Sequence, residues 1–350
     1  MIRQETFTKT NIDRIVAKYK VDYELAARAV FALGLTEALC KSGAEFIFKG
    51  GSSLMLLFET PKRLSTDVDI LVPPGYPIED YLKEAAKFYP FRGIQESIRK
   101  TNKTISKKHF KITYSSTNAD KDLTVIVDVL FAESHYKNLV RKAVNNDLLL
   151  CSGEDYYVKI PSPESILGDK LTAFAPHTIG INFYNSDFSN DKRLEVIKQF
   201  FDVSCLFDAC KNIEEVRATY FAVAHDEIEY RQLPLATTDC LMDSFNSAMC
   251  ILSRGKFDEG DLGNYIEGFK RISGHVLGRR IHINNVSIDA AKIMLLSASI
   301  LKGYDPFAVE IYEQDLLEHP PFNKINFVRK DNILAFSLAR KSISLLHDIE

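Results

Sequence analysis

The chain has 350 residues, a length that corresponds to about two domains. Hydrophobic residues make up 46% of it and charged residues 26%, which are ordinary values for globular proteins and exclude a disordered, collagen-like or low-complexity protein. The formal net charge of -3 means that any nucleic-acid partner has to be bound by a local basic patch.

The cysteines and the N-terminus indicate the compartment. Six cysteines are scattered without a Cys-x-x-Cys pair, so we expect neither a zinc site nor disulfide bonds. The first residues are polar and lack the apolar core of a secretory leader, and no later stretch reaches the about 18 apolar residues of a membrane span. We therefore expect a cytoplasmic protein with no membrane partner.

Helix and strand patterns alternate in the first 160 residues. Apolar residues recur at helical spacing between 22 and 42, and Gly43 stands at the position of a C-terminal cap. The patterns that follow predict, in chain order, a strand at 46–48, about two helical turns at 54–58, a strand at 67–72, a helix at 78–89 and strands at 110–114 and 123–130.

A Pro-Ser-Pro sequence at 161–163 marks a domain boundary. After it, helical patterns follow at 164–175, 194–210, 213–224, 238–252, 261–276, 288–302 and 332–346. We predict an α+β protein, with a mixed sheet and flanking helices in a domain of residues 1–160 and an irregular helical bundle in a domain of residues 161–350.

The most informative stretch is Gly-Gly-Ser-Ser at 50–53, followed by Asp67 and Asp69. Carboxylates two residues apart on a strand point to the same side, and Mg²⁺ prefers one or two carboxylates together with substrate phosphates. A Gly-Ser turn before a helix offers backbone N–H donors to those phosphates. Two Asp residues at this spacing also occur by chance. The pair Asp120 and Asp122 lies in a turn without an upstream glycine loop, so we interpret it as a solvated loop.

Asp128 is a third candidate because it stands in an otherwise apolar strand pattern. Burying an unpaired charge is costly, so such a carboxylate has either a partner or a metal. Two-metal phosphoryl-transfer sites combine a pair of carboxylates with a third one close to the attacking hydroxyl. The sequence thus favours Asp67, Asp69 and Asp128 as Mg²⁺ ligands. The alternative is that Asp128 pairs with a nearby Lys or Arg.

Two segments carry a family resemblance: Phe-Lys-Gly-Gly-Ser-Ser-Leu at 48–54 and Arg-Leu-Ser-Thr-Asp-Val-Asp-Ile at 63–70. They resemble the signature of the AbiEii/AbiGii toxin family of nucleotidyltransferases, within the DNA polymerase β-like nucleotidyltransferase superfamily. The resemblance covers residues 44–210 and implies a nucleotidyltransferase fold for the first domain. It also implies that the nucleotide is bound by Gly50, Gly51, Ser52 and Arg63.

The same resemblance extends to two helical segments of the second domain. Lys-Leu-Thr-Ala at 170–173 is similar to a Lys-Leu-x-Ala helix of the family, and the segment that ends at Asp202 is similar to its Lys-Asp-x-x-Asp helix, with Gln199 in place of the first acidic residue. The resemblance implies that Lys170 contacts nucleotide phosphate or the departing pyrophosphate, and that Asp202 orients this lysine or the nucleotide. Without it, Lys170 would be a surface lysine and Asp202 would pair with Lys198 one turn earlier.

Basic residues gather between 92 and 111, where Glu96 is the only acidic residue. A basic stretch of this kind can bind RNA phosphates, although a charge run is also typical of a solvated hairpin edge. The residues are Arg92, Arg99, Lys100, Lys103, Lys107, Lys108 and Lys111.

Together these patterns predict a Mg²⁺-dependent nucleotidyltransferase that moves a nucleoside monophosphate from an NTP to an acceptor hydroxyl and releases pyrophosphate. The resemblance implies the toxin of a bacterial toxin-antitoxin or phage-defence pair, with an antitoxin protein as partner and RNA, such as a tRNA 3′ end, as acceptor. Two alternatives stay open. One is a small-molecule nucleotidyltransferase of the aminoglycoside-modifying type, and the other is a catalytically silent member of the fold that binds RNA or protein.

Overall fold

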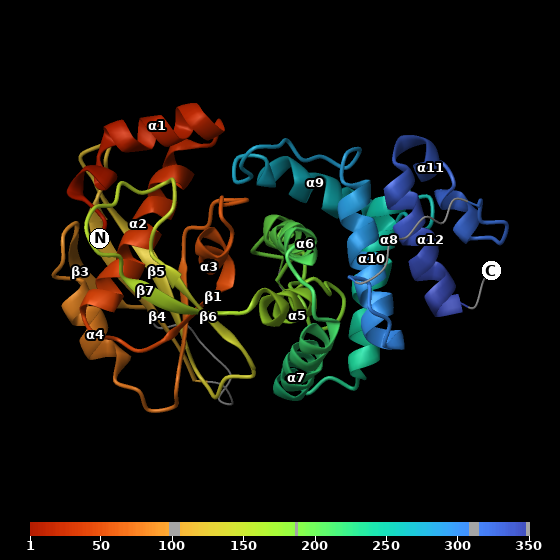
Figure 1. Cartoon of the computed structure of the whole chain (residues 1–350), viewed down its shortest axis with the longest axis horizontal. Helices are drawn as coiled ribbons and strands as arrows, with labels where there is room; N and C mark the ends of the chain where they lie inside the picture. Colours follow the sequence, from red (N-terminus) through yellow and green to blue (C-terminus); the bar gives the residue numbers. More distant parts are fainter. Residues whose placement is uncertain (98–105, 186–187, 308–314, 348–350) are drawn as a thin grey trace. The chain divides into compact units, whose positions relative to one another are not determined.

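A computed structural model describes residues 1–97, 106–185, 188–307 and 315–347. The chain forms two compact units (Figure 1). The first consists of Met1–Ser162 with Gly274–Arg279, and the second of Pro163–Ser273 with Arg280–Glu350. The first unit contains a mixed sheet and the second contains helices, which confirms the predicted α+β class. Among the described residues, no helix combines the length and the hydropathy that a membrane crossing requires.

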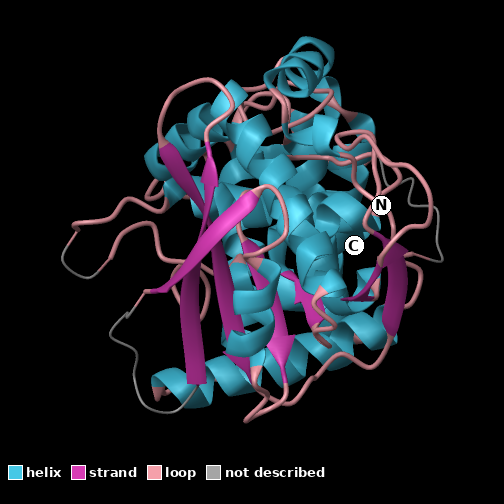
Figure 2. Ribbon diagram, turned by 90° about the vertical axis from the view of Figure 1, so that its left-hand side faces the viewer, coloured by secondary structure: helices cyan, strands magenta, loops and turns pink. Residues whose placement is uncertain are grey.

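The first unit is built on a seven-stranded sheet in the order β3-β4-β5-β2-β1-β7-β6, whose strands are drawn in magenta in Figure 2. The pairs β2/β5 and β1/β7 are parallel, and the other neighbours are antiparallel. The strands are β1 (Ile47–Lys49), β2 (Val68–Val72), β3 (Phe91–Glu96), β4 (Ser106–Ser115), β5 (Asp122–Phe131), β6 (Leu139–Ala143) and β7 (Tyr157–Pro161).

Helix α2 forms the core of the first unit by packing against one face of this sheet. Its N-cap Asp22 accepts a hydrogen bond from the Leu25 backbone N–H at 3.0 Å, which satisfies an otherwise unpaired donor of the first turn. Phe31 stacks on Tyr114 of β4 with 3.8 Å between ring centroids. The other helical segments of the unit are η1 (Gln4–Phe7), α1 (Lys9–Tyr19), α3 (Gly50–Leu57) and α4 (Ile78–Ala85), beside α2 (Tyr23–Lys41).

The predicted helix at 22–42 and the predicted strands at 67–72, 110–114 and 123–130 are confirmed as α2, β2, β4 and β5. Two local predictions were less accurate. The helix after the glycine turn already begins at Gly50, and α4 ends at Ala85, where the predicted helix continues to residue 89. Helix ends are set by the contacts of the last turn, which apolar spacing alone does not show.

A distant segment completes the first unit at the loop before β2. The Leu64 N–H donates to the His275 carbonyl at 2.8 Å, and the Leu277 N–H donates to the Lys62 carbonyl at 2.9 Å. Between these two hydrogen bonds, Arg63 forms an isolated β-bridge with Val276. The segment Gly274–Arg279 thus fixes the backbone of the loop that carries Arg63.

The second unit is a helical bundle with an aromatic core. Phe200 contacts Phe174 and Phe269 edge to face, with ring centroids 5.6 and 5.4 Å away. Its helical segments are α5 (Pro163–Ala173), α6 (Arg193–Phe207), α7 (Ile213–Arg231), α8 (Thr237–Ser253), α9 (Leu262–Ile272), α10 (Ser287–Lys302), η2 (Phe322–Ile325), α11 (Val328–Asp331) and α12 (Ile333–His347).

Candidate active site

A row of polar residues crosses four neighbouring strands of the sheet. In the strand register, Lys49 of β1 lies opposite Asp69 of β2, Asp69 lies beside Asp128 of β5, and Asp128 lies opposite His109 of β4. Side chains in register on adjacent strands point to the same face and are separated by about 5 Å. The register therefore brings two of the predicted carboxylates, Asp69 and Asp128, side by side.

These two carboxylates lie on the face of the sheet opposite to α2. Their strand neighbours Val68 and Val127 are fully buried, whereas Asp69 and Asp128 are half-buried. The Asp128 side chain is 36% exposed. Two carboxylates with access to solvent on one surface offer the oxygen ligands that a hard divalent cation prefers.

Gly50 allows the start of α3 to approach Asp69. Its φ is +71°, a backbone conformation that favours glycine, and a Cβ atom at this position would lie 1.9 Å from Asp69 Oδ2. Because the glycine has no side chain, the turn and the carboxylate can share this space. The contact joins the Gly-Ser turn to Asp69 of β2. A phosphate bound by this turn would therefore lie close to a metal ion bound by Asp69.

Gly51 lies against the loop that contains Arg63. A Cβ atom at Gly51 would lie 2.6 Å from an Arg63 guanidinium nitrogen and 2.7 Å from Ser65 Oγ. The Arg63 side chain is buried, and its Nη1 donates to the Leu64 carbonyl at 3.1 Å. The predicted nucleotide-binding residues Gly50, Gly51 and Arg63 are thus adjacent in the structure.

The serines of the turn have backbone partners. The Ser52 hydroxyl donates to the backbone carbonyl of Asp67, and the Ser53 hydroxyl donates to the Gly50 carbonyl at 2.9 Å. Both serines are fully buried. In this structure Ser52 therefore ties the turn to the strand that carries the carboxylates.

Asp67 lies directly before β2 and has a different environment from Asp69. Its carboxylate accepts a hydrogen bond from the Thr66 hydroxyl at 3.5 Å, and it lines a cavity of about 230 Å³ together with Asp122 and Ile126. Within the described ranges, no group of three or more His, Cys, Asp or Glu side chains is arranged to hold a metal ion. The structure thus shows a pair of adjacent carboxylates, with Asp67 two residues before Asp69.

His109 is a residue of this region that the sequence analysis missed. Its Nδ1 lies 2.6 Å from Asp128 Oδ1, and its side chain is only 12% exposed. The sequence analysis considered only Lys or Arg as a partner for Asp128. The available signal was the alternation of β4, which places His109 on the strand face opposite to the buried Phe110, Ile112 and Tyr114 and hence on the polar face.

Lys170 and Asp202 form a buried ion pair in the second unit. Lys170 Nζ lies 3.1 Å from Asp202 Oδ2 and donates a hydrogen bond to Gln199 Oε1 at 3.0 Å. Lys170 is 9% exposed and Asp202 2% exposed. Lys198 instead pairs with Glu195 at 2.9 Å. Lys170 is therefore not a surface lysine. One of its partners is Gln199, which replaces the first acidic residue of the family's Lys-Asp-x-x-Asp motif.

A protein-family model identifies the family of this chain. The family model "Nucleotidyl transferase AbiEii toxin, Type IV TA system" matches residues 35–251, which is more than half of the chain and includes every residue from Gly50 to Asp202 named above. The chain belongs to the AbiEii nucleotidyl transferase toxin family. The family resemblance of the two sequence motifs is thereby confirmed.

The solved structure of MenT4 supports the fold of this AbiEii-family chain, and a second solved structure has a lower similarity. MenT4, nucleotidyltransferase toxin Rv2826c from Mycobacterium tuberculosis H37Rv, is 13% identical with a TM-score of 0.53, and the match covers 95% of this chain and 98% of that chain. JHP933 from Helicobacter pylori is 14% identical with a TM-score of 0.45, over 79% of this chain and 92% of that chain. No curated protein matches this chain in sequence.

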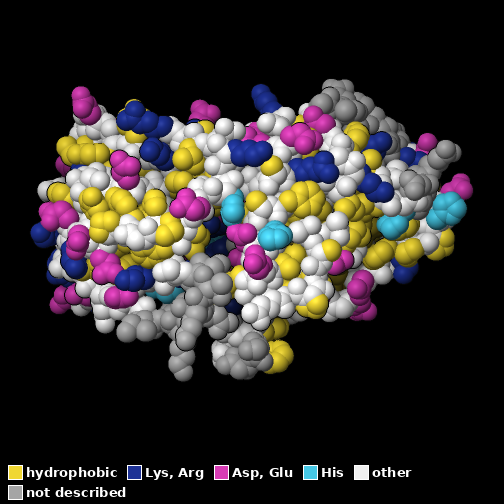
Figure 3. Space-filling model, turned by 90° about the horizontal axis from the view of Figure 1, so that it is seen from below, with side chains coloured by type: hydrophobic (Ala, Val, Ile, Leu, Met, Phe, Trp, Pro, Cys, Tyr) yellow, Lys and Arg dark blue, Asp and Glu magenta, His cyan; other side chains and the backbone are white. Residues whose placement is uncertain are grey.

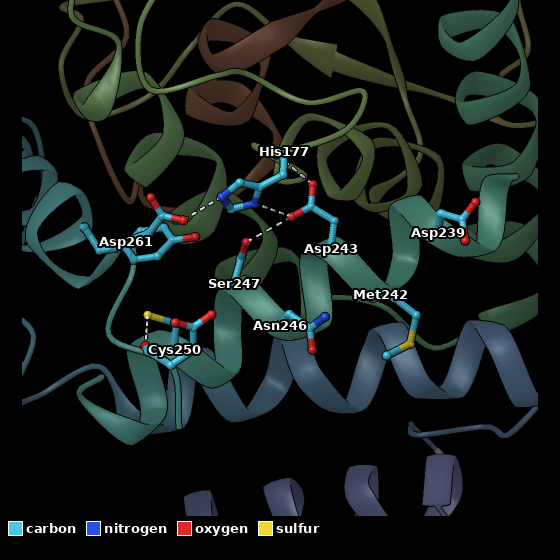
Figure 4. A pocket seen from close by; sticks show the side chains of 10 residues that line it. His177, Asp239, Met242, Asp243, Asn246, Ser247, Cys250 and Asp261 are labelled. Atoms are coloured by element: carbon cyan, nitrogen blue, oxygen red, sulfur yellow. Dashed lines mark hydrogen bonds and ion pairs between the residues drawn. The ribbon is translucent and has the colours of Figure 1, made fainter. Parts of the chain in front are cut away.

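The helical unit of this AbiEii-family chain also contains a pocket of about 400 Å³, and His177 is one of the residues that line it (Figure 4). His177 Nδ1 lies 2.7 Å from Asp243 of α8, and Nε2 lies 2.5 Å from Asp261, the N-cap of α9. The hydrogen bond and charge of Asp243, with those of Asp261, raise the pKa of His177 to about 9. With a proton on each nitrogen, the ring has no lone pair for base catalysis, so we interpret it as a clamp between the two helices.

The described part of the basic stretch divides between the two faces of the sheet. Arg92 forms an ion pair with Asp122, and Lys108 with Glu79. Side chains alternate between the two faces along β4, so Lys107 and Lys111 lie on the face of His109 and Lys108 lies on the other. Arg99, Lys100 and Lys103 lie outside the described residues. On the face drawn in Figure 3, the Lys and Arg side chains stand among Asp and Glu side chains.

Proposed function

We propose that this AbiEii-family chain is a Mg²⁺-dependent nucleotidyltransferase that transfers a nucleoside monophosphate from an NTP to an acceptor hydroxyl and releases pyrophosphate. The observation that carries the proposal is the adjacency of Asp69 and Asp128 on one sheet face, with the Gly50 turn directly against Asp69. Family membership supports the reaction class.

Asp69 and Asp128 would hold Mg²⁺, and Asp67 would join them through its position two residues before Asp69. The bound cation supplies charge neutralisation at the α-phosphate. The backbone N–H groups of Gly50 and Gly51 would donate to the triphosphate, since they begin the helix that follows β1. Ser52 supports this turn through its hydrogen bond to Asp67, and Arg63 supports it from the opposite side.

We assign Lys170 to contact with phosphate oxygens of the nucleotide or of the departing pyrophosphate. An ammonium group has three N–H donors, and Asp202 and Gln199 accept from two directions. Asp202 is therefore the residue that orients Lys170. The buried ion pair limits the rotamers of the lysine side chain, which is what a phosphate contact requires.

We assign RNA, with a tRNA 3′ end as the first candidate, as the acceptor. Lys107 and Lys111 of β4 lie on the same sheet face as Asp128, and Lys111 is exposed. Positive side chains beside the carboxylate that faces the acceptor hydroxyl would bind the acceptor's phosphates. Lys108 provides a matched control on the same strand, because it faces the other side and pairs with Glu79.

In the cell the chain would act in the cytoplasm as the toxin of a bacterial toxin-antitoxin pair, in phage defence, with a cognate antitoxin protein as partner. The family description names the type IV toxin-antitoxin system. Expression of wild-type chain and Asp69→Asn in the same host separates toxicity due to transfer from toxicity due to binding. Equal growth arrest by both would contradict a toxin that acts by nucleotidyl transfer.

The test of the reaction is incubation of the purified chain with total RNA, each labelled NTP in turn and Mg²⁺, with EDTA and Asp69→Asn as controls. A labelled RNA band that depends on Mg²⁺ and on Asp69 supports the proposal and identifies the nucleotide. Pyrophosphate release only in the presence of a small hydroxyl compound would overturn the RNA acceptor. No pyrophosphate release with any NTP would indicate a silent binding protein.

The acceptor is tested by charge reversal on the two faces of β4. Lys111→Glu should lower RNA labelling about tenfold or more, because a repulsive charge replaces an attractive one on the face of Asp128, two residues along β4 from His109. Lys108→Glu should leave labelling near the wild-type rate. Equal effects of the two variants would contradict the assignment of this face to the acceptor.

A further inference from the structure

His109 occupies the end of the polar row, on the side of Asp128 away from Asp69. The sheet order β4-β5-β2 places Asp128 between these two residues, and the register pairs it with both. The contact between His109 Nδ1 and Asp128 Oδ1 is 2.6 Å long, which is short for a hydrogen bond between nitrogen and oxygen. The contact thus joins an imidazole ring of β4 to a carboxylate of β5 on the proposed catalytic face.

The direction of this hydrogen bond follows from the acceptor. An ionised carboxylate has no proton to donate, so the Nδ1–H of His109 donates to Oδ1 in either charge state of the ring. Hydrogen bonds to a charged acceptor are stronger and more strictly aligned than neutral ones. The contact therefore selects one rotamer of Asp128 and engages the oxygen on the β4 side.

The second oxygen of Asp128 is then left for other ligands, on a carboxylate that lies in register with Asp69 of β2. His109 is well suited to fix this arrangement because its own side chain is only 12% exposed, whereas that of Asp128 is 36% exposed. The more exposed carboxylate is thus held by a less exposed ring.

We propose that His109 is a positioning residue: through Nδ1–H it holds the Asp128 carboxylate in the orientation needed for cation and acceptor hydroxyl. The inference rests on the proposed function of Asp128. In a purely structural cross-strand pair, the size of the His109 ring would matter. In the proposed role, the reaction depends on the hydrogen bond that the ring donates.

Two substitutions of His109 distinguish the positioning role from a purely structural role. His109→Asn retains a donor, since the amide nitrogen of Asn occupies about the place of the histidine Nδ1, and it removes most of the ring. His109→Leu removes the donor and retains apolar bulk. Thr113→Val on the same strand and face is the matched control, because Thr113 lies opposite Thr124, away from Asp128.

Four quantities are measured for each protein: kcat, KM for the NTP, the Mg²⁺ affinity of the nucleotide-free protein by calorimetry, and the thermal melting temperature. We expect His109→Leu to lower kcat and weaken Mg²⁺ binding by about 10- to 100-fold with little change in KM for the NTP. His109→Asn should recover most of both losses. Thr113→Val should resemble wild type in all four quantities.

Equal losses in His109→Leu and His109→Asn, or wild-type kcat and Mg²⁺ affinity in His109→Leu, would overturn the positioning role. Should His109→Leu fail to fold, a wild-type kcat and Mg²⁺ affinity in His109→Asn supports the role, and a loss of both overturns it. Asp69→Asn separates a failure of the positioning role from a failure of the proposed function. If the wild type transfers and Asp69→Asn does not, wild-type kcat and Mg²⁺ affinity in His109→Leu refute only the positioning role. Absence of transfer in the wild type refutes the proposed function itself.

Discussion

Aspartates have different surroundings in the two units. In the helical unit, Asp202 is almost fully buried against Lys170, and Asp243 is buried against His177, so each carboxylate has a cation beside it. On the sheet face, Asp69 and Asp128 are half-buried and lie next to each other. A buried carboxylate requires a partner, whereas two accessible carboxylates at close range repel each other and favour a shared divalent cation. The first arrangement holds each carboxylate against one cationic side chain, and the second suits a cation site.

The largest effect is expected where the buried pair is broken. Asp202→Asn should destabilise the chain by about 3 kcal/mol, because it leaves the Lys170 ammonium without its counter-charge in a buried place. Denaturant unfolding measures the difference. Asp208→Asn is the control: this carboxylate lies at the end of the same helix and pairs with Lys292, but its side chain is 62% exposed, so a change below about 0.5 kcal/mol is expected.

On the sheet face the charge should matter for activity and not for folding. Asp69→Asn should lower nucleotidyl transfer by at least about 100-fold, because the amide retains the shape but loses the negative charge for the cation. Thermal melting should remain close to wild type. Asp120→Asn in the exposed turn is the control for the second Asp-x-Asp pair and should be fully active. Transfer at the wild-type rate in Asp69→Asn would place the site elsewhere.

The glycine turn can be tested with two positions of similar backbone conformation. Gly50 and Gly43 both have positive φ, but a Cβ at Gly50 would collide with Asp69 while one at Gly43 would meet nothing within 4 Å. Gly50→Ala should weaken binding of a non-hydrolysable NTP about tenfold in calorimetric titration, because the carboxylate must move. Gly43→Ala should cost about 1 kcal/mol of stability through backbone strain and leave nucleotide affinity unchanged. Equal affinities in both variants would mean that the turn is only structural.

A smaller effect on stability sharpens the contrast between the units. In EDTA, Asp128→Asn should stay within about 1 kcal/mol of wild type in stability, since removing one of two neighbouring charges offsets the weaker hydrogen bond from His109. Mg²⁺ with an NTP should raise the melting temperature of the wild type and much less that of the variant. A large destabilisation of Asp128→Asn in EDTA would show that this carboxylate maintains the fold, as Asp202 does.

The smallest effect is expected from the His177 clamp. Its pKa is raised to about 9 in the folded chain from 6.5, so its contribution to stability is complete below pH 6.5 and is lost as the pH rises through 9. The side chain is 51% exposed, so after discounting for solvent screening we expect no more than about 1 kcal/mol. Denaturant unfolding of wild type and His177→Gln should differ at pH 6 and converge near pH 10. A difference that grows with pH would contradict the clamp.

Much of the sheet unit could be predicted from local pattern. Alternation between apolar and polar residues identified β2, β4 and β5, because a strand with one buried face repeats every two residues. The same alternation placed Asp67 and Asp69 on the polar face of their strand, and Asp128 was recognised as a carboxylate in an otherwise apolar strand pattern. The glycines between β1 and α3 were recognised as a special backbone turn, and the positive φ of Gly50 agrees with that prediction. These features depend on neighbours in sequence, so the sequence by itself determined them.

The tertiary structure decided which of these faces meet. Nothing in the pattern of β5 shows that it pairs with β2 in the register that aligns Asp69 with Asp128, or that β4 brings His109 to the same carboxylate. The choice of Lys170 over Lys198 as the partner of Asp202, and the return of Gly274–Arg279 to the first unit, are equally non-local. Strand register and helix packing are selected by the sum of contacts between segments far apart in the chain, and local spacing carries no record of that sum.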